Sequence, residues 1–333
     1  MDSSILFMYL GFALAAYSVV GNDVIQTLGT FLSSNEDKKW YVLWLYAGGI
    51  LAAVLIYGFI AYDGDVSYNR LIGAGPDTDY TAANPRYPLP DPMPWYFVLP
   101  PLVLLFITRF GIPVSTTFLI LTFFAPKELF PMVTKSLLGY VVAFGAAIAL
   151  YLGISKAIEW KFHQTELKQG TKERAYWTAA QWVSTGFLWT QWLSQDFANI
   201  YAYLPRKLEI PELAISLVII LGMLAYIFYQ RGGAIQGIVR SKTNTTDIRS
   251  ATIIDFSYGI ILYFFKDLSS IPMSTTWVFI GLLAGREIAL RYRFDQKVEK
   301  GTLKMVAMDF GKATLGLVVS VILVYLIKIL ETV

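Results

Sequence analysis

The chain has 333 residues, of which 56% are hydrophobic and 15% are charged, and its net charge at neutral pH is +3. Soluble domains carry roughly 25% charged residues, so this composition excludes an ordinary soluble protein. The chain contains no cysteine, which excludes disulfide bonds and thiol chemistry.

Long apolar segments predict an all-α polytopic membrane protein that lies in a lipid bilayer. A helix needs about 20 apolar residues to cross a bilayer. The segments expected to cross are 4–34, 41–62, 136–155, 175–204, 213–230 and 305–331. Among them, 4–34 contains Asp23 as its single charged residue, and 175–204 likewise contains Asp196.

Two other apolar segments, 95–125 and 256–285, are each interrupted by the hexad Ile-Pro-x-Ser-Thr-Thr. Proline cannot continue the hydrogen-bond ladder of a preceding helix, whereas serine and threonine cap a new one. We therefore predict two re-entrant hairpins, each made of two half-length helices that enter and leave the membrane on one side. Irregular backbone at that depth must be surrounded by protein or by a water-filled cavity.

With these hairpins, the first half of the chain makes an odd number of crossings, and the second half starts from the opposite face. We predict two inverted-topology repeats, 1–160 and 175–333, which a cytoplasmic linker, 161–174, joins into one transporter domain. Each repeat is expected to contain a broken helix, as in 175–204, and one re-entrant Pro-x-Ser-Thr-Thr hairpin.

The distribution of Lys and Arg fits this threading. One predicted face carries more than twice as many Lys and Arg residues in its loops as the other face does. The loops of this basic face are 35–40, 156–174, 231–250 and 286–304. Cytoplasmic loops are the more basic ones. We therefore expect an inner or plasma membrane protein with both termini, and the acidic loop 63–94, outside.

Two aspartate motifs lie within the predicted spans. Each has an amide, an aspartate next to it and a second amide three residues later: Asn22, Asp23 and Gln26, then Gln195, Asp196 and Asn199. Intramembrane carboxylates are costly and usually mark an ion or substrate pathway. Amides three residues away share the helix face and add neutral oxygen ligands, which suit sodium. The motifs predict two cation sites, or one cation site and one proton site.

The hexads predict an anion site between these cation sites. Each brings a helix N-terminus, which favours an anion, together with three hydroxyl groups. These belong to Ser115, Thr116 and Thr117, and to Ser274, Thr275 and Thr276. Discontinuous helices at the interface of inverted repeats form the usual binding site of secondary transporters. Arg109 could hold the anion or pair with an acid, and one hexad alone could simply kink or pack a helix.

The four motifs resemble those of the PiT family of inorganic phosphate transporters. "GNDVIQTLGT" is similar to that family's first signature, "SQDFANIYAYLP" more loosely to its second, and "IPVSTT" and "IPMSTT" to its two hairpins. The resemblance implies symport of inorganic phosphate with sodium ions or protons, and a homodimer. It implies that Asn22, Asp23, Asp196 and Asn199 serve the cations and that the six hexad hydroxyl residues cradle the phosphate.

The sequence departs from this family at Gln26 and Gln195, where the signatures have asparagine, and at Phe118 and Trp277, where the hairpins have histidine. These departures leave open a symporter of another oxyanion, such as sulfate, or a non-transporting membrane sensor with the same fold. We expect no enzyme, because the chain shows no nucleophile–base pair and no Gly-rich phosphate loop. We also expect no nucleic-acid partner.

Overall fold

The computed structural model describes residues 3–76, 78–109, 114–153, 165, 167, 170–230, 248–268, 271–293 and 300–330. These residues are mainly helical, and an isolated bridge between Gly75 and Thr78 is the one β-type pairing among them. The α-helices are α1 (Ser3–Ser34), α2 (Trp40–Ala61), α3 (Leu99–Arg109), α4 (Thr116–Phe124), α5 (Leu129–Gly153), α7 (Lys172–Tyr201), α8 (Ile210–Tyr229), α10 (Ile248–Leu268), α11 (Thr275–Arg293) and α12 (Lys300–Leu330). Two short 3₁₀ helices, Trp95–Val98 and Pro126–Glu128, precede α3 and α5.

Within the described part of the chain, five helices contain a stretch long and apolar enough to cross a membrane. The stretches are Ser3–Val24, Trp40–Ala61, Pro126–Gly153, Ile210–Tyr229 and Ile248–Phe265. Their outward faces carry large apolar side chains such as Ile60, Phe130 and Val218, each more than two-thirds exposed. Lipid is the solvent that suits such a surface, so the structure agrees with the predicted all-α membrane protein.

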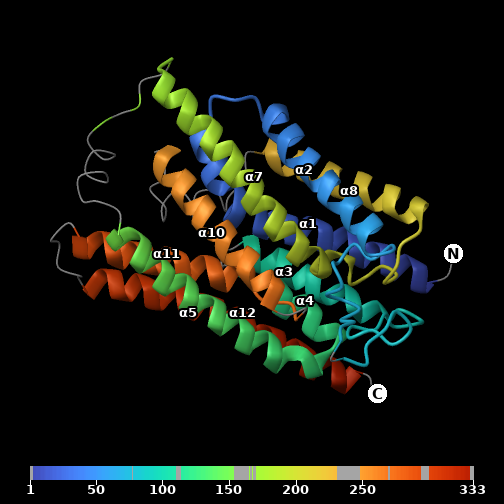
Figure 1. Cartoon of the computed structure of the whole chain (residues 1–333). Helices are drawn as coiled ribbons and strands as arrows, with labels where there is room; N and C mark the ends of the chain where they lie inside the picture. The colour runs from blue at the N-terminus through green and yellow to red at the C-terminus, as the bar shows by residue number, and fades with distance from the viewer. Residues whose placement is uncertain are drawn as a thin grey trace.

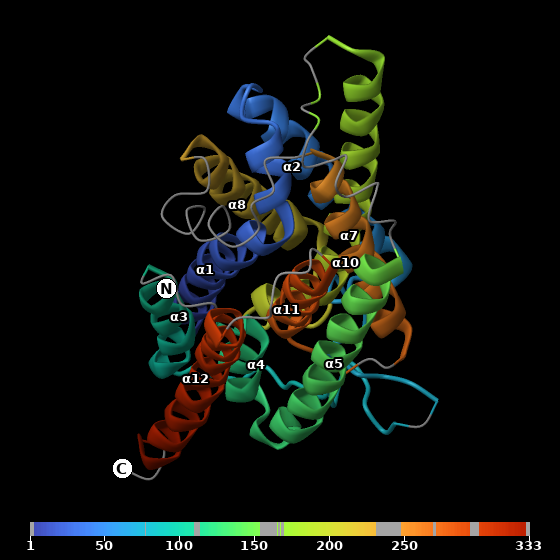
Figure 2. The same cartoon turned by 90° about the vertical axis from the view of Figure 1, so that its left-hand side faces the viewer.

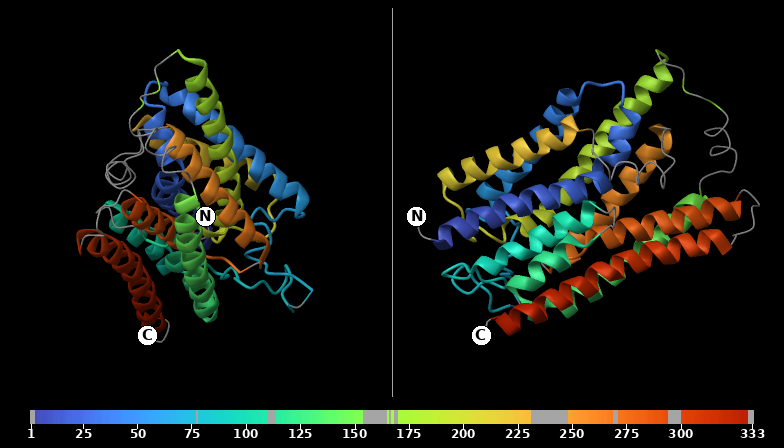
Figure 3. Two further views of the ribbon diagram at one scale, coloured as in Figure 1. Left: turned by 60° about the vertical axis from the view of Figure 1, so that its left-hand side comes forward. Right: turned by 180° about the vertical axis from the view of Figure 1, so that it is seen from behind.

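The helices run between two ends of an elongated molecule (Figures 1 and 3). The start of α1, the end of α12 and the loop between α2 and α3 lie at the same end, as the predicted threading requires. The beginning of α7 lies at the opposite end. Which end faces the cytoplasm stays a prediction.

Helices from the two halves of the chain are interleaved. Near the middle, α1 packs against α7; α1 also packs against α8, α7 against α2, and α2 against α8. Two indoles fix these contacts, because Trp44 Nε1 donates to Leu221 O at 3.1 Å and Trp189 Nε1 donates to Ala47 O at 3.0 Å. This part of the core is therefore built between the two halves of the chain.

The second helix of each hairpin packs on the last helix of the other half: α4 on α12, and α11 on α5 (Figure 2). In the α5–α11 contact the backbones come very close. A Cβ placed on Gly281 or Gly285 would overlap the carbonyl groups of Tyr140 and Phe144. Small residues four positions apart permit this approach between membrane helices.

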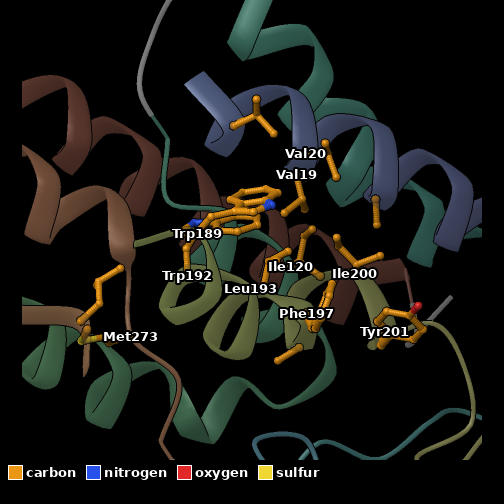
Figure 4. Close-up of a cluster of buried hydrophobic side chains, with 14 of the residues drawn as sticks. Val19, Val20, Ile120, Trp189, Trp192, Leu193, Phe197, Ile200, Tyr201 and Met273 are labelled. Atoms are coloured by element: carbon orange, nitrogen blue, oxygen red, sulfur yellow. The ribbon is translucent and has the colours of Figure 1, made fainter. Parts of the chain in front are cut away.

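Aromatic side chains fill the centre around α7 (Figure 4). Trp189 and Trp192 are buried and stacked, with ring centroids 4.8 Å apart and planes 4° from parallel. Phe197 and Tyr201 follow along the same helix and pack edge to face, 5.8 Å apart. Burial of these large rings fixes α7 as the central element of the molecule.

The loop between α2 and α3 is folded onto the helices, although the sequence predicted only an acidic outer loop. Asp65 is buried and accepts hydrogen bonds from the N–H groups of Ser67 and Asn69 at 2.7 and 2.8 Å. Burial raises the pKa of Asp65, and these bonds partly oppose that rise. Arg206, which follows α7, holds the loop from the other side, because one of the four backbone carbonyls to which it donates is that of Tyr87. Burial lowers the pKa of Arg206 to about 9.

The structure corrects the prediction of broken helices. α1 and α7 each run as one helix through the aspartate motif, so 175–204 has no break before Tyr201. The reason is local, because no proline interrupts either stretch. Side chains such as Thr27 bond back to the preceding turn, here to Asp23 O at 2.9 Å, and leave the helix intact.

The hairpins also differ from each other in length. The first has short arms, α3 and α4, as predicted for 95–125. The second extends beyond the predicted 256–285, because its arms α10 and α11 cover 248–268 and 275–293. α10 contains one of the five stretches long enough to span a bilayer. Re-entrant insertion of either hairpin therefore stays a prediction.

Candidate functional site

The two hexads meet at the centre of the molecule and exchange hydrogen bonds. Thr117 Oγ1 donates to the carbonyl of Met273, and Thr276 Oγ1 donates to the carbonyl of Val114, both at 3.2 Å. The sixth residue of each hexad therefore donates to the carbonyl of the third residue of the other, so the two bonds are reciprocal.

Serine caps start both helices that follow the hexads. Ser115 Oγ accepts from Phe118 N at 3.1 Å at the start of α4, and Ser274 Oγ accepts from Trp277 N at 3.4 Å at the start of α11. The capping serine satisfies one N–H group, while others in the first turn have no partner inside the helix. Two helix N-termini thus converge on the hexad contact, an arrangement that favours an anion.

The first aspartate motif binds the first hexad. Asp23 Oδ1 accepts from Asn22 Nδ2 at 2.7 Å, and Asp23 Oδ2 accepts from Thr116 Oγ1 at 3.0 Å. Asn22 Nδ2 also donates to Val114 O at 3.1 Å. The motif and the hexad, about 90 residues apart in sequence, therefore form one polar unit.

The second aspartate motif joins the same unit through Asn199. Its Nδ2 lies 2.6 Å from Asp196 Oδ1, 3.1 Å from Thr116 Oγ1 and 3.2 Å from Thr117 Oγ1. Thr116 thus stands between the two motifs, because it donates to Asp23 and receives from Asn199. A continuous hydrogen-bonded chain connects Asp23 with Asp196.

Three buried oxygen atoms at this centre accept no hydrogen bond from any described residue: Asp196 Oδ2, Asn199 Oδ1 and Gln26 Oε1. A buried acceptor without a donor costs free energy, which a bound cation or proton would remove. Hard cations prefer such carboxylate and amide oxygens. These three oxygens are therefore suitable ligands for the predicted sodium ions, which would be transported ions and not a resident cofactor.

The centre is closed to solvent. Both aspartates and all six hexad hydroxyl residues are at most 1% exposed. Phe118 and Trp277, which directly follow the two hexads, lie beside it with ring centroids 5.7 Å apart. Charged or polar cargo could reach the hexads only after part of this packing opens.

Two predicted site residues, Gln195 and Arg109, differ from the others in their surroundings. The amide of Gln195 is turned toward α10, where Nε2 donates to Leu262 O at 3.0 Å, so Asn199 makes the contacts of this motif to the first hexad. Thr275 belongs to the centre, because its side chain acts on the Asp196 carboxylate and its carbonyl accepts from Tyr258 at 2.9 Å. Arg109 ends α3, but its side chain, like Ile112 and Pro113, lies outside the described residues.

Several polar residues near the centre were missed by sequence reasoning. Asp255 is buried in α10 and accepts from Thr30 on α1 and Thr185 on α7, each at 2.6 Å. Lys135 Nζ donates to Ile271 O at 2.7 Å, and Ser136 Oγ accepts from Ser274 N at 2.8 Å. Asp255 lies one residue before the predicted apolar segment 256–285, and no repeated motif accompanied it, so the amino-acid sequence gave little signal for it.

We expect the Thr30→Val, Thr185→Val double variant to lose about 3 kcal/mol of unfolding free energy or more, because each hydroxyl donates to a buried carboxylate. Thermal unfolding in detergent measures the loss. Thr190→Val on the same helix is the control, since the Thr190 hydroxyl bonds back to Gly186 O and its replacement should cost much less. A double variant as stable as the wild type would contradict this role of Asp255.

No known protein family matches the chain by its sequence pattern, and no curated protein matches it by sequence. Its fold is similar to that of a solved structure described as "The sodium-dependent phosphate transporter". The TM-score is 0.59, the match covers 99% of this chain and 100% of that one, and the sequences are 16% identical. The two chains therefore share a fold, and together with its apolar helices this fold makes the chain an integral membrane protein.

Proposed function

We propose that this protein is a secondary active transporter that carries inorganic phosphate together with a cation, sodium in the first instance, across the inner or plasma membrane. One observation carries the proposal: a single hydrogen-bonded network joins both aspartate motifs to both hexads. Anion-binding helix N-termini and cation-binding oxygens then lie within a few ångströms of each other. Binding of one ion favours binding of the other, which is the basis of coupling.

In this mechanism the phosphate takes the N–H groups at the starts of α4 and α11 and the hydroxyls of both hexads. The carboxylates of Asp23 and Asp196, with the oxygens of Asn199 and Gln26, hold the cations. Thr116 belongs to the first hexad and also contacts Asp23 and Asn199, so it adjoins both the proposed phosphate site and the proposed cation sites. Arg109 is proposed to neutralise the incoming anion at the first hairpin.

The proposal includes two inverted repeats, 1–160 and 175–333, with re-entrant hairpins and both termini outside. The paired contacts support it: α1 with α8 matches α7 with α2, and α4 with α12 matches α11 with α5. The reciprocal bonds between the hexads follow the same pattern. Alternating access would then move one hairpin assembly past the other. A homodimer is part of the proposal.

Uptake of labelled phosphate into proteoliposomes tests the function. We expect uptake that rises with an inward sodium gradient and stays at background with an inward potassium gradient. A proton gradient alone, run beside it, identifies protons as the coupling ion if it suffices. Absence of uptake under every gradient contradicts phosphate transport by this protein.

A second candidate is symport of another oxyanion, such as sulfate. Phe118 and Trp277 favour it, because two apolar rings border the hexads where the family has imidazoles. Excess sulfate should then suppress labelled phosphate uptake, and labelled sulfate should itself accumulate. Binding of either anion without any flux would indicate a non-transporting sensor.

A further inference from the structure

An apolar groove opens on the lateral surface of the molecule between α2 and α7, which pack against each other (Figure 1). Its volume is about 410 Å³. The side chains that line it come from both helices: Tyr46 and Ile50 from α2, and Trp182, Val183, Phe187 and Thr190 from α7. Val183 is 74% exposed, so the groove faces the surroundings of the protein and not its closed centre.

Aromatic contacts hold the walls of the groove in place. Tyr46 and Trp182 pack with ring centroids 4.7 Å apart, and each also packs against the buried ring of Phe31 on α1. Phe187 contacts two aromatic rings of α10. Gly186 leaves room for the Tyr46 hydroxyl, because a Cβ at that position would overlap it. The groove is therefore a preformed hollow with rigid walls.

The polar groups of the lining side chains already have partners within the protein. The Tyr46 hydroxyl donates to Trp182 O, and Thr190 Oγ1 donates to Gly186 O at 2.9 Å. Trp182 Nε1 donates to Asn35 Oδ1 at 3.1 Å. These described side chains leave no donor for a polar or charged ligand, so the groove suits a hydrocarbon.

The groove lies at the depth of the hydrocarbon layer of a membrane. Tyr46 and Ile50 fall within Trp40–Ala61, one of the stretches that are long and apolar enough to cross a bilayer. Lys39 is exposed directly before this helix, where a cationic side chain attracts the phosphate of a lipid. Tyr46 lies about 10 Å further along the helix. A phospholipid whose phosphate lies beside Lys39 therefore reaches the groove with its acyl chain.

The size of the groove favours a lipid chain over a second copy of the protein. A stable protein–protein interface buries about 800 Å² on each partner. A hollow of about 410 Å³ instead has the size of a site for one small ligand. Lipid chains surround the exposed faces of an integral membrane protein, and an empty hollow among them would lose the van der Waals contacts of its walls.

We propose that the groove between α2 and α7 is a binding site for one acyl chain of a membrane phospholipid, which stays bound when the protein is taken out of the bilayer. The bound chain fills the space between the two helices and adds packing to α7, the helix that carries Asp196. The inference concerns the lateral surface and does not depend on the proposed function.

Photolabelling in proteoliposomes tests the site, with a phosphatidylcholine that carries a diazirine on one acyl chain. Digestion and mass spectrometry should find the label in the groove about fivefold or more above its level at Val218, which is 71% exposed on α8. Val183→Trp puts an indole at the groove and should lower its labelling by a similar factor. Val218→Trp is the matched control and should leave the labelling of the groove unchanged.

The purified protein offers a measurement that needs no variant. Mass spectrometry of the intact wild type, after size-exclusion chromatography in detergent, should show one phospholipid bound to each chain. Val183→Trp should lose this lipid, and Val218→Trp should keep it. Unfolding temperatures of the two variants, compared with each other, show whether a lost lipid reflects a filled groove or a damaged fold.

Three outcomes would overturn the site: label spread evenly over the exposed faces of the helices, a purified wild type without lipid, or a folded Val183→Trp variant that keeps its lipid. The chain has no cysteine, so Val183→Cys introduces a single thiol. Rapid disulfide formation between two copies through this thiol would place a second copy at the groove and also overturn the proposal. Absence of phosphate uptake by the wild type would count against the proposed function and leave the lipid site standing.

Discussion

Replacing Asp196 by asparagine is expected to lower sodium-driven phosphate uptake by about a hundredfold or more while the protein stays folded. The Oδ2 atom of Asp196 accepts no hydrogen bond from a described residue, and Oδ1 accepts from Asn199 at 2.6 Å. Asparagine can keep the second contact and loses only the charge and one oxygen. The variant therefore removes cation binding with little change in packing. Initial uptake rates at increasing sodium concentration measure the effect.

Asp23→Asn should have the same effect on uptake but a larger one on stability, since both oxygens of Asp23 accept hydrogen bonds from Asn22 and Thr116. Asp63→Asn is the control, because Asp63 lies on the surface beside Lys207. The stacked Trp189 and Trp192 lie on the same helix as Asp196. Sodium should change their fluorescence in the wild type and not in Asp196→Asn. Normal transport by both aspartate variants would show that the cation sites are assigned wrongly.

The second large effect is expected at the contact between α5 and α11. Gly281→Ala and Gly285→Ala should each destabilise the protein by about 1–3 kcal/mol, and the double variant by roughly the sum. Each new methyl group would meet the backbone of Tyr140 or Phe144, which cannot move aside as a side chain can. α11 would then have to shift, and the second hexad at its start would shift with it. Thermal unfolding of the purified variants measures the loss.

Gly145→Ala on α5 provides the control for that experiment, because a Cβ there would meet no atom within 4 Å. Its stability should stay within about 1 kcal/mol of the wild type, on the favourable side if helix propensity decides. Equal stability of Gly145→Ala and Gly285→Ala would mean that the two helices are not in the close contact described here.

The residues at the centre were predictable because they occur twice. The repeated hexads and the repeated aspartate–amide motifs indicate one polar site from the amino-acid sequence alone, and Asp23, Thr116, Asn199 and Asp196 do lie together. Repetition identifies residues that act in pairs. It gave no indication of Asp255, which bonds to Thr30 and Thr185 and belongs to neither motif.

The prediction that failed overlooked a local rule. A mid-membrane polar motif suggested a broken helix, yet α7 continues through Asp196 because no proline interrupts it. For the loop 63–94 the Lys and Arg distribution predicted only its side of the membrane, not how it packs. Its Arg70 and Arg86 are buried, a placement that depends on contacts far away in the chain.

The packing of α4 on α12 has a consequence for how the chain is made. α12 leaves the ribosome long after α4, and its Gly316 lies against Val114, whose carbonyl accepts from Asn22 and Thr276. Until α12 is in place, α4 lacks one of its main supports, and the first hexad cannot settle against Asp23. The polar centre is therefore completed only after α12 has been made, long after the first hexad has been synthesised.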